Sequence, residues 1–318
     1  MSDERRRSAR DLLLRLRRKA QYTLYRQRWN VAITPFSAAA VAGLEGAAVQ
    51  RAALDALDWM PERGDAFVAD PFVTRDPHRP EALLIFYELF PWQRAQGLIG
   101  AARYNDGQFG EGRIVLDTGH HLSYPFVLGE GETLRVMPEH SAARDLSSYA
   151  VAADATLTDP RPVEREHRLI DATIVEWEGR HWLFCTHAGP TENSELHAYH
   201  AAGPAGPWTP HRANPIRRDR GGARPAGAFI VNGGKLFRPA QDCRAHYGAG
   251  IVVHAVERLT ADDYRETVVS EIRPPAGSRY DYGLHTISSV GTHTVIDGAR
   301  MESLIHPRLD RWGRYLRA

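Results

Sequence analysis

Carboxylic acid side chains stand at the borders of several short apolar segments of this sequence. Asp70 opens the segment Asp-Pro-Phe-Val, Asp171 opens Asp-Ala-Thr-Ile-Val, and Glu139 closes Leu-Arg-Val-Met-Pro-Glu. Carboxyl groups gathered in one site can divide into a protonated acid and an ionised base, because burial and neighbouring charges move their pKa values apart. These three residues are therefore the first candidates for chemistry.

Further polar and aromatic residues lie at comparable borders and could supply positive charge, hydrogen bonds and aromatic surface to a ligand. The candidates for binding are Glu88, His121, Tyr124, His187, Arg224, Arg238, Gln241, Asp242, Tyr247 and His285. Taken singly, Asp70 could be a turn residue before proline, and Glu88 a solvated strand end. The set as a whole favours a functional site, because ionisable groups recur at every border.

The segments that carry these residues are five aligned hairpins, each a strand, a tight turn and a returning strand. They begin at Asp70, Tyr124, Asp171, Arg224 and His285, and their starts lie 47 to 61 residues apart. This spacing is close to the period of about 40–50 residues for the four-stranded blades of a β-propeller. The sequence therefore predicts an all-β fold, a five-bladed β-propeller.

In a propeller the innermost strand of every blade begins at the same mouth of the central channel, and its hairpin partner returns there. The first and last residues of the five hairpins should therefore converge on one site. The fifth repeat is short of strands, and residues 30–33 near the N-terminus could supply the missing one. Such pairing would close the ring and remove an open sheet edge.

The start of the chain has a different character. Residues 4–28 predict a basic amphipathic helix, so that residues 1–28 form an extension and residues 29–318 the propeller. We favour a helix packed on the propeller surface, with peripheral contact to an anionic membrane as the alternative. A short second helix is expected at residues 47–57.

Composition excludes several classes of function. The 318 residues carry 40 basic and 39 acidic side chains, which gives no basic surplus for nucleic acid. No apolar stretch is long enough to cross a membrane. The two cysteines, Cys185 and Cys243, do not match zinc-ligand spacing and predict reduced thiols in a cytoplasmic protein. No cofactor or metal is expected, although a cation between Asp70 and Asp171 stays open.

Several motifs carry a family resemblance. They are His121-Leu-Ser-Tyr-Pro-Phe-Val127, Met137-Pro-Glu139, Asp171-Ala-Thr173, Gly206-Pro-Trp-Thr-Pro-His211, Ala223-Arg-Pro-Ala-Gly227, Arg238-Pro-Ala-Gln-Asp-Cys243, Tyr247-Gly248 and His285-Thr286. From Trp29 onward the chain resembles the propeller domain at the N-terminus of plant glucosamine inositolphosphorylceramide transferases and its stand-alone bacterial relatives. More distantly it is similar to the five-bladed arabinanase, β-xylosidase and fructosidase glycoside hydrolases.

The hydrolase resemblance implies roles for the blade heads. It implies that Asp70 is the base or nucleophile and that Asp171 orients and tunes the site. The fourth blade begins with Arg224 where those hydrolases have a glutamic acid, so the acid must come from elsewhere, with Glu139 or Glu88 as candidates. Glycoside hydrolysis needs two carboxyl groups about 5 Å apart for retention or about 6.5–9.5 Å apart for inversion.

The cationic residues bear on the choice of ligand. Arg224, Arg238 and the histidines predict an anionic sugar, a sugar phosphate or a nucleotide-linked donor. Alternatively, the two arginines neutralise buried aspartates in an ion network. The sequence thus predicts a carbohydrate-active protein that cleaves or transfers a glycosidic linkage. The alternative is a non-catalytic propeller that recognises a glycan or glycolipid for a separate glycosyltransferase partner.

Overall fold

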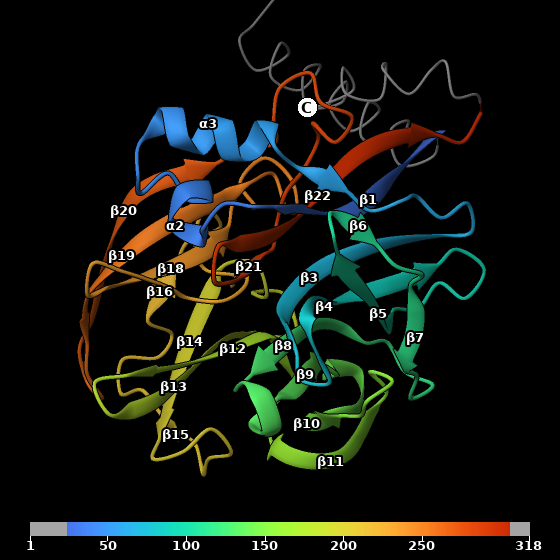
Figure 1. Cartoon of the computed structure of the whole chain (residues 1–318). Helices are drawn as coiled ribbons and strands as arrows, with labels where there is room; N and C mark the ends of the chain where they lie inside the picture. Colours follow the sequence, from blue (N-terminus) through green and yellow to red (C-terminus); the bar gives the residue numbers. More distant parts are fainter. Residues whose placement is uncertain (1–23, 306–318) are drawn as a thin grey trace, which may run out of the picture.

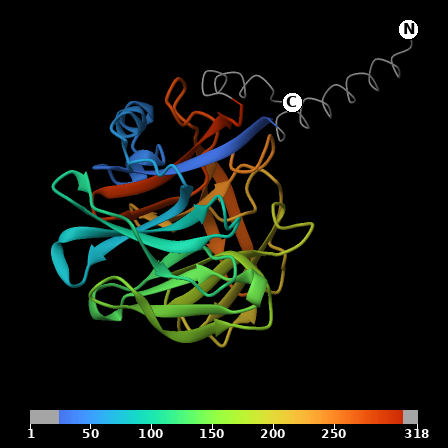
Figure 2. The ribbon, with the colours of Figure 1, turned by 90° about the vertical axis from the view of Figure 1, so that its right-hand side faces the viewer.

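The five predicted hairpins form the inner parts of five antiparallel sheets. The computed structural model describes residues 24–305, and Figures 1 and 2 show the sheets arranged as the blades of a propeller. Blade 1 contains β3 (Ala66–Asp76), β4 (Arg79–Pro91), β5 (Leu98–Asn105), β6 (Gln108–Phe109) and β7 (Arg113–Leu116). Blade 2 contains β8 (Ser123–Leu128), β9 (Arg135–Glu139), β10 (Leu146–Val151) and β11 (Leu157–Glu164), with short 3-10 turns at Gly131–Thr133 and Ser141–Ala143.

The next two blades repeat this order from the channel outward. Blade 3 contains β12 (Leu169–Trp177), β13 (Arg180–His187), β14 (Glu195–Ala201), β15 (Thr209–Pro210) and β16 (Arg217–Arg218). Blade 4 contains β17 (Ile230–Asn232), β18 (Lys235–Gln241), β19 (Ile251–Leu259) and β20 (Tyr264–Ile272).

Blade 5 closes the ring as the sequence predicts. It pairs β21 (Ile287–Val290) and β22 (His293–Ser303) with β1 (Tyr25–Thr34) and β2 (Asp58–Trp59), in the order β2-β1-β22-β21. Strand β1 pairs with β22 along its whole length, and Figure 1 shows these two strands side by side. The N-terminal strand thus supplies the hydrogen bonds that the last repeat lacks.

The helix predicted for residues 4–28 is wrong over its last residues. Residues 25–28, predicted as helix, are the first residues of β1, so the propeller begins by Tyr25 and not at residue 29. Most of β1 is buried, and tertiary pairing with β22 decides its conformation. The rest of the predicted helix, up to residue 23, lies outside the described residues. The second predicted helix is present as α3 (Ala47–Asp55), preceded by α2 (Ala38–Val41).

Packing between the blades holds the ring together. One apolar cluster joins blades 1, 2 and 3 through Phe72, Phe126 and Leu183, and another packs α2 against blades 4 and 5. Both cysteines are buried free thiols, as the sequence predicts. Among the described residues, no helix is long and apolar enough to cross a membrane.

Candidate functional site

A shared backbone irregularity aims the head residues of the first three blades at the channel. The pairing of β3 with β4, β8 with β9 and β12 with β13 shifts register at Asp70, Tyr124 and Asp171 respectively. All three residues have positive φ angles, of 50°, 43° and 51°. A β-bulge with a non-glycine residue in this conformation is uncommon, and such strain gathers at functional sites because it redirects a side chain.

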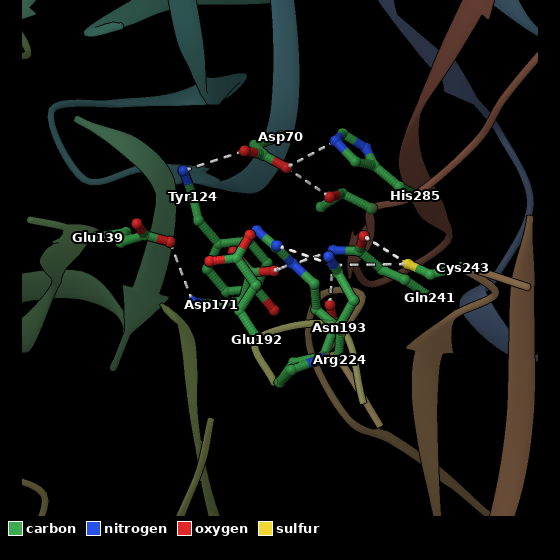
Figure 3. Close-up of polar contacts among 12 residues, drawn as sticks. Asp70, Tyr124, Glu139, Asp171, Glu192, Asn193, Arg224, Gln241, Cys243 and His285 are labelled. Atoms are coloured by element: carbon green, nitrogen blue, oxygen red, sulfur yellow. Dashed lines mark hydrogen bonds and ion pairs between the residues drawn. The ribbon is translucent and has the colours of Figure 1, made fainter. Parts of the chain in front are cut away.

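Asp70 joins blade 1 to blade 5. Its carboxylate accepts hydrogen bonds from the Thr286 hydroxyl at 2.7 Å and from the Tyr124 backbone N–H at 3.3 Å, and it lies 3.7 Å from His285 Nε2 (Figure 3). Burial raises the pKa of Asp70 to about 6, although the positive charge of His285 opposes the shift. Asp70 is therefore close to half-protonated slightly below neutral pH.

His285 is held between two carboxylates. Its Nδ1 contacts Asp297, which also accepts the backbone N–H groups of His285 and Asp70. The Trp29 ring stacks on the imidazole with 4.1 Å between ring centroids. Burial lowers the pKa of His285, but the charges of Asp297 and Asp70 outweigh it and the net shift is upward. The imidazole thus favours its cationic form.

Asp171 meets Arg224 across the boundary between blades 3 and 4. Arg224 Nε donates to Asp171 Oδ2 at 2.6 Å, and Gln241 Nε2 donates to the same oxygen at 2.9 Å. Arg224 Nη1 also donates to Asn193 at 3.1 Å, and the guanidinium lies 4.9 Å from the centre of the Tyr247 ring. The arginine therefore compensates the buried charge of Asp171, as the second sequence interpretation of Arg224 anticipated.

Glu139 lies beside Asp171. One carboxyl oxygen accepts the Asp171 backbone N–H at 3.1 Å, and the other accepts the Ser141 hydroxyl at 2.9 Å. Burial and then the charge of Asp171 raise the pKa of Glu139 to about 8, while Arg224 works in the opposite direction. Glu139 thus retains its proton at neutral pH, next to the Asp171 carboxyl group, which is paired with Arg224.

Glu88 and His121 form an adjoining pair. Gly97 N–H donates to His121 Nδ1 at 2.9 Å, which places the ring proton on Nε2, and that atom lies 3.8 Å from Glu88. Burial, reinforced by the neighbouring acids Asp70 and Glu139, raises the pKa of Glu88 well above its usual value. Burial lowers the pKa of His121.

Tyr124 serves the architecture of the channel. Its hydroxyl bonds to Thr173 Oγ1 at 2.7 Å and accepts the Gly227 backbone N–H at 2.7 Å. The ring is almost fully buried, with its edge against Phe72. Tyr124 thus ties blades 2, 3 and 4 together at the head of the second blade.

Three predicted binding residues have their partners elsewhere. Arg238 is buried and forms an ion pair with Glu266 at 2.7 Å. Asp242 is held by Arg244 and Arg273, whose hydrogen bonds outweigh burial and lower its pKa to about 2. These two residues fit structural roles. His187 contacts the Tyr199 hydroxyl at 2.8 Å and stacks on His197, on the outer side of blade 3.

The structure adds residues that the hairpin alignment missed. Asn193 fixes Arg224, Thr286 binds Asp70, and Ser141 binds Glu139. Glu192, next to Asn193 in the loop after β13, also extends toward this cluster in Figure 3. Ser141 and Asn193 follow the returning strands of the second and third hairpins, whereas Thr286 is the second residue of the fifth hairpin. Counting one turn past each returning strand would have found Ser141.

Three side chains at the mouth are also potential metal ligands. The ligand atoms of Asp70, His285 and Asp297 lie within 4.8 Å of one another. Their carboxylate oxygens already accept hydrogen bonds from the Thr286 hydroxyl and from several backbone N–H groups. The arrangement therefore matches a network around an imidazolium ion, in which the protein itself supplies the positive charge.

Two solved structures share this architecture at low sequence identity. The α-L-arabinofuranosidase of Podospora anserina, solved with cellotriose, superposes with a TM-score of 0.55 at 12% identity, covering 73% of this chain and 81% of that one. The exo-β-1,3-galactanase of Clostridium thermocellum gives a TM-score of 0.51 at 8% identity, covering 78% and 69%. These likenesses show the fold.

Sequence comparison shows the family. Glucosamine inositolphosphorylceramide transferase 1 of Oryza sativa subsp. japonica is 34% identical over 253 residues, which cover 74% of this chain and 34% of the relative. The Arabidopsis thaliana protein of the same name is 35% identical over 210 residues, covering 64% and 27%. The chain thus spans about a third of the length of these relatives. The family model described as the N-terminal part of glucosamine inositolphosphorylceramide transferase 1 matches residues 58–283, and the chain belongs to this family.

Proposed function

We propose that the channel mouth binds a carbohydrate and that the protein cleaves or transfers a glycosidic linkage there. The observation that carries this proposal is the contrast between Glu139 and Asp171. Burial raises the pKa of Glu139 to about 8, whereas the carboxyl group of Asp171 is paired with Arg224 at 2.6 Å. A carboxyl group that keeps its proton, beside one that is paired with a cation, suits acid–base catalysis at a glycosidic bond.

In this proposal Glu139 donates a proton to the leaving oxygen. Asp70 serves as the base or nucleophile, because its pKa of about 6 leaves it largely ionised at neutral pH. Asp171 orients Glu139 through its backbone N–H and holds Arg224 in place. The bulges at Asp70 and Asp171 would keep these carboxyl groups in fixed positions while the sugar enters.

The buried charges also bear on the sugar. Among the described residues, five buried carboxyl groups lie close to the cationic groups Arg224 and His285; they are Asp70, Glu88, Glu139, Asp171 and Asp297. The anionic ligand that the sequence predicts stays a prediction. Its negative charge would have to compete with the Asp171 carboxyl group for the guanidinium of Arg224. An amino sugar suits a position among these carboxyl groups better, since its ammonium group would be attracted to the carboxylates. Glucosamine, which occurs in the name of the relatives, is such a sugar.

One observation favours recognition without catalysis as a second candidate. Arg224 lies directly on Asp171, and this ion pair occupies the place where a substrate would meet the carboxylate. In that case the mouth would hold a glycan or glycolipid headgroup for a separate glycosyltransferase. The two candidates differ in whether the ligand is chemically changed.

The test is incubation with a panel of sugar nucleotides and oligosaccharides, with products read by mass spectrometry and binding by calorimetry. The panel contains neutral, amine-bearing and anionic sugars. Turnover that is lost in Glu139→Gln and Asp70→Asn, with binding retained, supports catalysis. Binding without turnover that is lost in Asp171→Asn supports recognition. A panel that gives neither binding nor turnover refutes both candidates.

A further inference from the structure

A second cluster of metal-binding side chains lies outside the central channel, at the boundary of blades 2 and 3. Glu164 ends β11, and Glu166 and His167 follow in the turn that leads into β12. Ligand atoms of these three residues lie within 4.8 Å of one another, and His167 Nδ1 is 3.2 Å from Glu164 Oε1. Two carboxylates and an imidazole are ligands that a divalent transition metal accepts together.

His187, at the end of β13, lies next to this set and could join it. Its ring centre lies 5.4 Å from that of His167, with 31° between the planes. Two imidazoles bound to one tetrahedral zinc ion have ring centres about 5 Å apart, given Zn–N bonds of about 2.0 Å. His197 stacks on His187 at 4.0 Å with nearly parallel planes, so those two rings cannot direct lone pairs at one ion.

The surroundings of His187 favour a ligand role. Its Nε2 lies 2.8 Å from the Tyr199 hydroxyl, which can accept a hydrogen bond from Nε2–H. In that tautomer the Nδ1 lone pair is available to a metal.

The cluster also has room for an ion. A cavity of about 490 Å³ is lined by Glu164, Glu166, His167, Tyr199 and Trp208. Glu164 Oε1 accepts the backbone N–H groups of Glu166 and His167, so the turn itself holds this carboxylate inside the cluster. A bound ion would thus have water-accessible space beside fixed ligands.

We propose that Glu164, Glu166, His167 and His187 bind one divalent transition-metal ion of the zinc type. This proposal does not rest on the sugar chemistry proposed for the mouth. The ion would fasten the turn after blade 2 to the base of the loop that follows β13. That loop contains Asn193, which positions Arg224, so the ion would steady one wall of the central site.

The test uses the untagged full chain, stripped with a chelator and titrated with Zn²⁺ in a calorimeter, with Co²⁺ absorbance as a report on ligand geometry. We expect one Zn²⁺ per chain. His167→Ala and His187→Ala should each weaken binding by about tenfold or more, because each removes a ligand. The matched control is His120→Ala, an exposed histidine whose ring lies 5.8 Å from His140, and it should bind Zn²⁺ unchanged.

Each outcome of the titration either supports or overturns the proposal. Stoichiometric binding that needs both His167 and His187 supports the proposal. Absence of Zn²⁺ uptake at micromolar concentration overturns it, and so does binding that survives both substitutions. Melting curves with and without Zn²⁺ give a second reading, because an ion that binds only the native state raises the melting temperature. No outcome depends on finding a sugar substrate.

Discussion

Replacing Glu139 by glutamine tests whether this buried acid is neutral. The unfolded chain should release the Glu139 proton near the ordinary pKa of 4.5, whereas the folded chain keeps it until about pH 8. Between these values the native state binds one proton more than the unfolded state, so the free energy of unfolding falls as pH rises. The stabilising contribution of this proton is complete below pH 4.5 and is lost by about pH 8.

The size of the effect follows from proton linkage. One proton changes stability by about 1.4 kcal/mol per pH unit, which amounts to roughly 3 kcal/mol over two pH units inside the window. Glutamine has the shape of the neutral acid and does not titrate. Relative to the wild type, Glu139→Gln should therefore gain about 3 kcal/mol of stability between roughly pH 5.5 and pH 7.5.

Urea unfolding followed by circular dichroism at a series of pH values measures this difference. Glu132→Gln, which removes an exposed carboxyl group of the same blade, is the matched control and should show a difference from wild type that does not vary with pH. Parallel pH profiles for the wild type and Glu139→Gln would refute the reasoning, because they would mean that Glu139 is already ionised at neutral pH.

Three further perturbations have definite expected outcomes. Arg224→Met should cost about 3–5 kcal/mol in urea unfolding because it leaves Asp171 buried and unpaired, and a double variant with Asp171→Asn should recover part of that loss. Gly227→Ala should destabilise by about 2–5 kcal/mol in the same assay, because its φ is +107° and a Cβ would lie 1.8 Å from the Ile287 carbonyl oxygen; an unchanged unfolding midpoint would contradict this. Deletion of residues 1–34 should abolish near-ultraviolet circular dichroism by removing β1, whereas deletion of residues 1–23 should preserve it.

The hairpin pattern in the sequence was sufficient to predict the blades. Alternating apolar runs bounded by glycine, proline and aspartate reflect local preferences, and their repetition limited the fold to a propeller. The closing strand was predicted as residues 30–33, and the structure extends it to Tyr25–Thr34. The first residues of that strand were predicted as helix. They pair with β22, which lies almost a whole chain length away, so no pattern among their neighbours in the sequence reveals the pairing.

Convergence of the heads Asp70, Tyr124 and Asp171 on one mouth could also be predicted, because it follows from the topology of a propeller. The sequence alone could not decide the partner of each charge. Arg224 pairs with Asp171, yet Arg238 pairs with Glu266 on β20. Arg224 precedes β17 and Arg238 lies within β18, and the carboxylate that each arginine meets is supplied by another strand.

The sequence by itself determined the number of blades, the strand that closes the ring and the residues that head each inner strand, because these depend on patterns of neighbours along the chain. The tertiary structure alone decided which carboxyl group keeps its proton and which is paired with a cation. Burial and then the charge of Asp171 raise the pKa of Glu139, and Asp171 is paired with an arginine that lies 53 residues away in the chain. Electrostatic energy depends on distance in space, and separation along the chain does not report it.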